Sequence, residues 1–302
     1  MKFDQILREV SDVRSDLERL RARFEILYEE LFSDGSPLNR RLKGRGLKIY
    51  RQHPQQRLLI PHNLSPALTT EFYEKMKKYS FRLFLRDLLR AEGSFCPHDL
   101  TRYCSNRVAE EYTRFLNATS TLASLKGNQY RLNRPGISSF GPTLEWFVAQ
   151  MFQRDFACPA IFGVNFKETD TGGDYDVLSL WEGRLVYVEV KSSPPKSIED
   201  PEIKAFLSRL HDLIPDVAFF FNDTHLRMMD KVIKIFKREM DRAPEGRLLV
   251  NSPERLSDEV YHVDHWIYIL NSKRDIVGNF SLCLRDHLRK SRELWSLRTK
   301  SA

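Results

Sequence analysis

The first thirty or so residues carry an apolar side chain at every third or fourth position. These positions are Ile6, Val10, Val13, Leu17, Leu20, Phe24, Leu27 and Leu31, and the spacing alternates between four and three residues. Such a strict heptad is typical of a coiled coil, so residues 1–33 are expected to form a helix that pairs with a second copy of the chain. A single amphipathic helix laid against its own domain fits the same pattern.

A second helical pattern begins near residue 78 and ends in a hairpin. Apolar residues at helical spacing predict a helix that ends at Gly93, and Pro97 begins a short second helix. Ser105 is the expected N-cap of a third helix. The sequence Lys126-Gly127-Asn128 then predicts a turn between two short strands. Three helices followed by a small hairpin resemble the winged-helix superfamily, which implies a winged-helix-like domain over residues 78–135.

The winged-helix resemblance implies a role for the third helix, which enters the major groove in DNA-binding members. Its exposed side would present Arg107 and Arg114 to DNA, and the hairpin turn would add Lys126. The adjacent acids Glu110 and Glu111 would repel phosphates, however. Contact with a protein, or simple scaffolding, is therefore an alternative to base recognition.

From about residue 140 the hydrophobic pattern changes to alternating helices and strands. The predicted elements are a helix over 143–152, strands over 160–166, 175–181 and 185–190, a helix over 198–213 and a strand over 217–221. This order is α-β-β-β-α-β. Later segments are expected to add a helix over 226–240, a strand over 266–270 and a closing helix over 279–290. We therefore expect an α/β domain with a mixed central sheet over residues 136–302.

The third of these strands carries a distinctive alternation of side chains. In Val186-Tyr187-Val188-Glu189-Val190-Lys191, the three valines point to one face of the strand and the other three residues point to the opposite face. Glu189 and Lys191 therefore project side by side. Asp176 begins the preceding strand, and Glu182-Gly183 predicts a tight hairpin that places this aspartate beside them.

Carboxylates and a lysine on neighbouring strands suit the hydrolysis of a phosphodiester. The attacking water must be activated, and the charge that develops on the phosphoryl oxygens must be stabilised. Mg²⁺ does both when hard oxygen ligands hold it and leave positions free for water and phosphate. A lysine beside the ion can orient the water and add positive charge.

Together, these residues resemble the PD-(D/E)XK nuclease superfamily, whose core has the same restriction-endonuclease-like element order. The resemblance rests on Asp176, on Glu189-Val190-Lys191 thirteen residues later, and on Glu145 in the preceding helix. It implies that Asp176 and Glu189 bind Mg²⁺ or Mn²⁺ with help from the carbonyl of Val190, and that Glu145 completes the site. Lys191 would position or activate the water. The resemblance covers about residues 140–225.

One departure from the family pattern leaves two candidate aspartates. The proline that commonly precedes the aspartate is absent from Thr171-Gly172-Gly173-Asp174-Tyr175-Asp176. Asp176 directly precedes the apolar strand and is the preferred metal ligand. Asp174 lies two residues earlier, as a possible second acid or a loop-stabilising residue.

The net charge of +7 is compatible with a polyanionic partner, and its distribution is uneven. Residues 34–61 contain seven basic side chains and one acidic side chain. The residues expected to contact phosphates there are Arg40, Arg41, Lys43, Arg45, Lys48 and Arg51. With too few apolar residues for a core of their own, residues 34–77 are expected to form a basic connector arm. A solvated linker without nucleic-acid contacts is the alternative.

Composition narrows the class of protein further. Apolar residues make up 41% of the chain and charged residues 29%, as in ordinary globular proteins. The sequence has neither a secretory leader nor an apolar stretch long enough to span a membrane, so a cytoplasmic location is expected. Four scattered cysteines form no zinc-binding pattern. The absence of P-loop and Rossmann fingerprints argues against NTP hydrolysis and hydride transfer.

These inferences predict a divalent-metal-dependent nuclease that acts as a DNA endonuclease in repair or defence. The expected partners are double-stranded DNA and a second copy of the chain. Two other classes of function remain open. The first is a DNA-binding regulator whose nuclease-like fold no longer cuts, and the second is an interaction module whose activity a partner protein controls.

Overall fold

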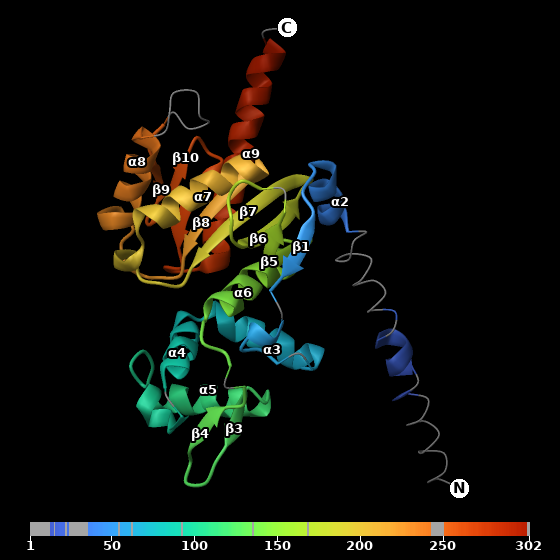
Figure 1. Cartoon of the computed structure of the whole chain (residues 1–302), viewed down its shortest axis with the longest axis vertical. Helices are drawn as coiled ribbons and strands as arrows, with labels where there is room; N and C mark the ends of the chain where they lie inside the picture. Colours follow the sequence, from blue (N-terminus) through green and yellow to red (C-terminus); the bar gives the residue numbers. More distant parts are fainter. Residues whose placement is uncertain are drawn as a thin grey trace.

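A large mixed β-sheet lies at the centre of the computed structural model (Figure 1). The structure describes residues 13–14, 16–21, 23, 36–53, 55–61, 63–91, 93–134, 136–167, 169–242 and 251–300, with side chains up to residue 293. Within these ranges the strand order is β1-β5-β6-β7-β8-β11-β10-β9. The strands are β1 (Ile49–Gln52), β5 (Ala160–Phe166), β6 (Tyr175–Trp181), β7 (Arg184–Lys191), β8 (Val217–Asn222), β9 (Glu254–Ser257), β10 (Val260–Val263) and β11 (Ile267–Asn271).

The middle of this sheet has the predicted α-β-β-β-α-β order. It runs from α6 (Gly141–Arg154) through β5, β6 and β7 to α7 (Asp200–Leu213) and β8. Strands β5, β6 and β7 are antiparallel, whereas β7 and β8 are parallel. Glu182 and Gly183 both have positive φ angles, which suits the two-residue turn of the predicted β6–β7 hairpin. The expected α/β fold and mixed sheet are confirmed.

Each face of the sheet packs against helices. Val186, Val188 and Val190 of β7 lie in one apolar cluster with α6 and with α9 (Ile276–Lys300). Tyr187 lies in the other cluster, with α7 and with α8 (Lys234–Asp241). The alternation predicted for β7 is therefore confirmed, and it directs Glu189 and Lys191 toward the face that carries α7.

The basic segment after residue 34 is part of this core and not an extended arm. Helix α2 (Pro37–Gly44) buries Leu38 and Leu42 in the cluster with α7, and strand β1 pairs with β5 at the edge of the sheet. Further along, α3 (Pro66–Lys77) packs on α6. The expectation of a connector was wrong for the described residues. Their apolar side chains are too few to form a separate core, but they pack into the core of the large sheet.

Residues 79–132 form a smaller unit at the far end of α6 (Figure 1). It contains α4 (Tyr79–Arg90), a short 3-10 helix (Pro97–Leu100) and α5 (Asn106–Ala118), together with a small sheet of β2 (Ser94–Phe95), β4 (Tyr130–Leu132) and β3 (Leu122–Ser124). These are the predicted helices and hairpin, with an additional short strand. The apolar cluster under α6 continues without interruption into this unit.

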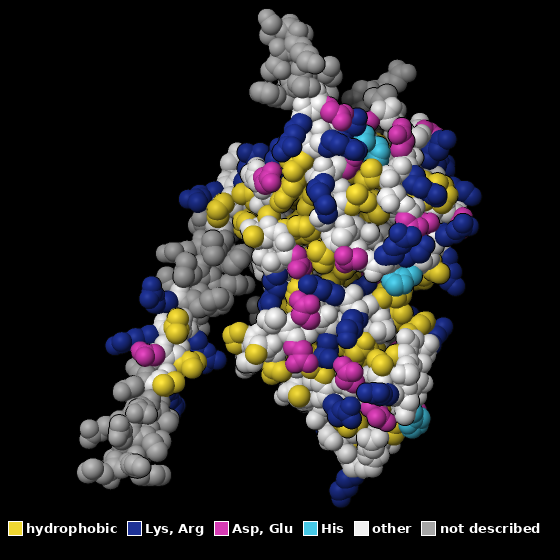
Figure 2. All heavy atoms as spheres, turned by 180° about the vertical axis from the view of Figure 1, so that it is seen from behind, with side chains coloured by type: hydrophobic (Ala, Val, Ile, Leu, Met, Phe, Trp, Pro, Cys, Tyr) yellow, Lys and Arg dark blue, Asp and Glu magenta, His cyan; other side chains and the backbone are white. Residues whose placement is uncertain are grey.

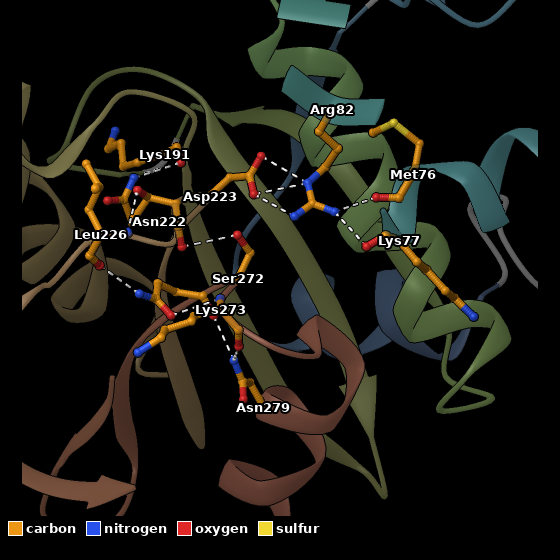
Figure 3. A network of polar contacts seen from close by, with 12 residues as sticks. Met76, Lys77, Arg82, Lys191, Asn222, Asp223, Leu226, Ser272, Lys273 and Asn279 are labelled. Atoms are coloured by element: carbon orange, nitrogen blue, oxygen red, sulfur yellow. Dashed lines mark hydrogen bonds and ion pairs between the residues drawn. The ribbon is translucent and has the colours of Figure 1, made fainter. Parts of the chain in front are cut away.

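A buried ion pair joins the small unit to the large sheet (Figure 3). Arg82 of α4 is 1% exposed, and Asp223, directly after β8, is 0% exposed. Nε and Nη2 of Arg82 donate to the Asp223 carboxylate at 2.8–3.0 Å, while Nη1 donates to the carbonyls of Met76 and Lys77 at 2.6 and 3.0 Å. Arg82 therefore also satisfies carbonyls that would lack partners at the end of α3.

The heptad segment lies mostly outside the described residues. Those that are described are helical at residues 13–14, 16–21 and 23. Val13, Leu17 and Leu20 are 57–67% exposed, and apolar side chains are visible on this segment in Figure 2. The coiled coil therefore stays a prediction. None of the helices in the described ranges combines the length and apolar content that a membrane span requires.

The last third of the chain differs in detail from the expectation. The helix predicted over 226–240 begins as a π-helix (Met229–Ile233) and continues as α8. Strand β11 and helix α9 occur where a strand and a closing helix were predicted. Strands β9 and β10 were not predicted, and they extend the sheet beyond β11.

Candidate active site

Glu189 and Lys191 lie side by side at the end of β7, as the alternation predicts. The Lys191 Nζ is 2.8 Å from Oε1 of Glu189. Glu189 is only 1% exposed, whereas the lysine side chain is 21% exposed and also faces Glu202 of α7 at 3.8 Å. The lysine can therefore reach solvent and a substrate, while the glutamate is enclosed.

Asp176 is held next to this pair by the backbone of the same strand. The N–H of Val190 donates to the Asp176 carboxylate at 2.7 Å. Since Asp176 belongs to β6, this bond fixes the candidate acids of two strands across the hairpin. Asp176, Glu189 and Lys191 are therefore brought together.

The pKa values of the two strand acids, Asp176 and Glu189, are shifted in opposite directions. Burial alone would raise the pKa of Glu189, but the positive charges of Lys191 and Arg209 outweigh it and hold that pKa below its ordinary value. The pKa of Asp176 lies well above its ordinary value, because burial and then the charges of Glu189 and Glu145 all disfavour its ionised form. The pKa of Lys191 is raised, since Glu189 and Asp176 together outweigh the opposing effect of burial.

Glu145 of α6 lies within electrostatic reach of these acids and faces a histidine. Burial raises its pKa, and His53 opposes this increase only in part. The Oε2 of Glu145 is 3.2 Å from Nδ1 of His53. Both atoms are buried, and among the described residues their contact is an ion pair and not an aligned hydrogen bond. Glu145 is therefore held against His53 at the edge of the acidic group.

His53 was not predicted as a site residue. It directly follows β1, and its N–H donates to the Gly163 carbonyl at 2.7 Å. The imidazole lies against Gly163 so closely that a Cβ there would be 2.3 Å from its Nδ1. Nε2 of the ring contacts Asp174. The histidine thus connects Glu145 to Asp174, and the contact with Glu145 raises the pKa of His53 despite burial.

Asp174 has a different environment from Asp176. The Asn165 side chain donates to it at 2.5 Å, and His53 contacts its other oxygen. Burial would raise the pKa of Asp174, but these two partners lower it below its ordinary value. Asp174 therefore fits the predicted loop-stabilising role, and a role as a second ligand stays open.

The acids suit a divalent cation in chemical kind, although they do not form a finished cage. Oxygen donors are what Mg²⁺ prefers, and the mutual repulsion of Asp176, Glu189 and Glu145 is what such a cation would relieve. Glu145 adds a third carboxylate, whose Oε2 faces His53. Within the described ranges, however, no three His, Cys, Asp or Glu side chains are arranged at ligand distances. Binding would therefore need a local rearrangement of side chains.

Arg209 and Tyr187 are further site residues that the sequence did not reveal. Nη1 of Arg209, from α7, donates to both oxygens of Glu189 at 2.8 and 3.0 Å, and the Tyr187 hydroxyl contacts Oε2. Because alternation on β7 places Tyr187 on the same face as Glu189, the sequence could have predicted this contact. Arg209 had none, because it looks like any charged residue on an amphipathic helix.

The residues predicted to bind nucleic acid lie in two places. The exposed residues of the first group are Arg40, Arg41 and Lys43 on α2, Lys48 just before β1, and Arg51 on β1; those of the second group, on the small unit, are Arg107, Arg114 and Lys126. Arg45 differs from these, since it donates to the carbonyls of Leu213 and Ile214 at 2.6 Å and thereby caps α7. On the face shown in Figure 2, basic and acidic side chains are interspersed and form no continuous basic patch.

Two solved structures have a distantly similar backbone. Protein VC1899 from Vibrio cholerae is 16% identical, with a TM-score of 0.40 over 55% of this chain and 50% of that one. Can2 from Sulfobacillus thermosulfidooxidans, solved with cyclic tetra-adenylate, is 13% identical, with a TM-score of 0.37 over 62% of this chain and 51% of that one. The match spans about half the length of each protein. No family model and no curated protein matches the sequence.

Proposed function

We propose that the protein is a divalent-metal-dependent nuclease of the PD-(D/E)XK type, acting on DNA as an endonuclease. The single observation that carries this proposal is the Val190 N–H bond to Asp176, which sets that carboxylate beside the Glu189–Lys191 pair. Two strand acids, a lysine and a nearby helix acid are the groups that phosphodiester hydrolysis needs.

Each residue has a proposed task. Asp176, Glu189 and Glu145, with the Val190 carbonyl, would hold Mg²⁺ or Mn²⁺, which supplies Lewis acidity and a more acidic water when bound. Lys191 would hold the water and face the phosphate, because it is the partly exposed member of the pair. Asp174 and His53 would keep Glu145 and the loop before β6 in place.

The small unit supports a winged-helix-like role in choosing the substrate. Its order of α4, β2, a 3-10 helix, α5, β3 and β4 resembles that of a winged helix, and Arg107, Arg114 and Lys126 are exposed there. The flanking basic residues of α2 and β1 would contact phosphates. A cytoplasmic repair or defence role would suit such an enzyme. A silent DNA-binding regulator with the same fold is the competing function.

Cleavage assays test the proposal directly. Purified protein would be incubated with supercoiled DNA, linear DNA and RNA, in Mg²⁺, Mn²⁺ or EDTA, beside Glu189→Ala and Lys191→Ala. We expect cleavage of DNA in metal only, and a loss of at least about a thousandfold in either variant. Glu182→Ala, in the exposed hairpin turn, is the control and should retain activity. Cleavage that persists in both site variants contradicts the assignment, while metal-independent binding without cleavage supports the regulator.

A homodimer is the second part of the proposal. The exposed apolar side chains at positions 13, 17 and 20 keep the heptad spacing, and a second copy would cover them. Deletion of residues 1–33 should halve the mass that light scattering measures. A monomer mass for both the full chain and the truncated chain would contradict the dimer.

A further inference from the structure

The carboxylate of Glu189 has no vacant position for a metal ion. A carboxylate offers about four lone-pair sites on its two oxygens. Oε1 faces Lys191 at 2.8 Å and Arg209 at 3.0 Å, while Oε2 faces Arg209 at 2.8 Å and also the Tyr187 hydroxyl. These contacts occupy all of the sites. A cation can therefore bind Glu189 only if one of its donors leaves.

The three donors are not held equally firmly. Tyr187 is fully buried, and its ring stacks on Phe206 with 5.9 Å between centroids. Nζ of Lys191 carries three N–H donors and lies 2.8 Å from Glu189 and 3.8 Å from Glu202, so it can keep its contact with Glu189 while it faces a water. Arg209 makes both of its bonds to Glu189 with Nη1, and its buried Nε has no hydrogen-bond partner among the described residues. Arg209 is therefore the donor that has further guanidinium nitrogens to offer to another partner.

The surroundings of Arg209 show where its guanidinium already points. Its Nη2 is 3.0 Å from the place where a Cβ on Gly173 would lie. Gly173 belongs to the loop that leads to Asp174 and Asp176. The same helix holds this loop, since Asp212 accepts hydrogen bonds from the N–H groups of Asp170 and Thr171 at 3.1 and 3.0 Å. The arginine thus lies between Glu189 and a loop that borders the site and has no side chain at Gly173.

We propose that Arg209 exchanges partners when the site is loaded. In the metal-free protein it neutralises Glu189; with a divalent cation on Glu189, its fork turns to a phosphate of the bound nucleic acid. Guanidinium groups pair with phosphates in a planar, bidentate manner, which makes the exchange favourable in a site with excluded water. This inference rests on the proposed nuclease function and adds a substrate-contacting residue to it.

The exchange makes two opposite predictions for one substitution. Arg209→Met keeps most of the side-chain volume and removes the charge. Because Arg209 and the cation compete for Glu189, Mn²⁺ should bind the variant several-fold more tightly than it binds wild type. Because the phosphate loses a charged donor, affinity for a DNA duplex in Ca²⁺ should fall about tenfold. Lys204→Met, an exposed position on the same helix, is the matched control and should change neither affinity.

Titration calorimetry with Mn²⁺ alone, and duplex binding in Ca²⁺, measure the two quantities on the full-length protein. Tighter Mn²⁺ binding together with weaker duplex binding supports the exchange. Unchanged or weaker Mn²⁺ binding in Arg209→Met overturns it, because Arg209 then only orients Glu189. If wild type binds no Mn²⁺, the proposed function fails instead. Should Arg209→Met not fold, Arg209→Gln is expected to shift both affinities in the same directions, and a failure to do so overturns the exchange.

Discussion

Two arginine–carboxylate pairs in the described part of the chain look alike and differ in how completely the arginine is hydrogen-bonded. In the Arg82–Asp223 pair, every guanidinium nitrogen has a partner, including two backbone carbonyls (Figure 3). In the Arg209–Glu189 pair, one nitrogen makes both bonds to the carboxylate, and Nε has no partner. The first arginine is fully hydrogen-bonded and joins the small unit to the sheet. The second keeps a nitrogen without a partner among the described residues, as expected of a side chain that changes partner.

Substituting methionine for each arginine would sharpen this comparison most. Arg82→Met leaves Asp223 buried without a counter-charge and two carbonyls without donors, so the free energy of unfolding should fall by about 3–5 kcal/mol. Arg209→Met leaves Glu189 paired with Lys191, and its loss should be about 1 kcal/mol. Urea unfolding in EDTA measures both values.

Two controls belong to this experiment. Arg90→Met removes an arginine that is 63% exposed and should change the free energy of unfolding by less than about 0.5 kcal/mol. Replacing both members of the buried pair, as in Arg82→Met with Asp223→Leu, should recover much of the single-variant loss. Equal losses for Arg82→Met and Arg209→Met would remove the distinction between the two pairs.

A smaller effect of the opposite sign is expected at Asp176. Its raised pKa means that its protonated form favours the folded state, so this contribution is present below the pKa of the unfolded chain, about 4, and is lost as pH rises through the folded value. In EDTA, Asp176→Asn should therefore unfold at a higher temperature than wild type at pH 8, with little difference near pH 4.

Thermal unfolding across this pH range tests the expectation. The exposed Asp230→Asn should follow wild type at every pH and serves as the control. A variant at Asp176 that is less stable than wild type at pH 8 would mean that the carboxylate is structural, like Asp223. The contrast between the structural Arg82–Asp223 pair and the mutually repelling acids around Asp176 would then no longer hold.

The sequence was informative where chemistry follows local periodicity. Alternation along β7 predicted that Glu189 and Lys191 project together, and the hairpin turn predicted that Asp176 lies beside them. Both depend on contacts between residues close in the chain. The α-β-β-β-α-β order followed from the same local patterns.

The sequence alone could not identify His53 and Arg209 as site residues, for a physical reason. His53 meets Asp174 across 121 residues of chain, through a four-residue strand whose mixed polarity gives little periodic signal. Arg209 contacts Glu189 because of how α7 crosses the sheet, which a helical pattern does not specify. The prediction of a connector arm over residues 34–77 failed for the same reason, because the elements that bury Leu38 and Leu42 follow much later in the chain.

Strand β1 pairs with β5, which follows more than a hundred residues later in the chain, and this separation affects when the candidate site can form during synthesis. Ribosomes add about 5–20 residues per second, so the 121 residues between His53 and Asp174 take on the order of ten seconds to emerge. Strand β1 has no partner until β5 (Ala160–Phe166) has been synthesised, and Asp174 follows only after that strand. Contacts of such long range also form slowly once the chain is free, because loop closure must precede them. The candidate site draws on residues from His53 to Arg209, so that a chain released before residue 209 would lack part of it.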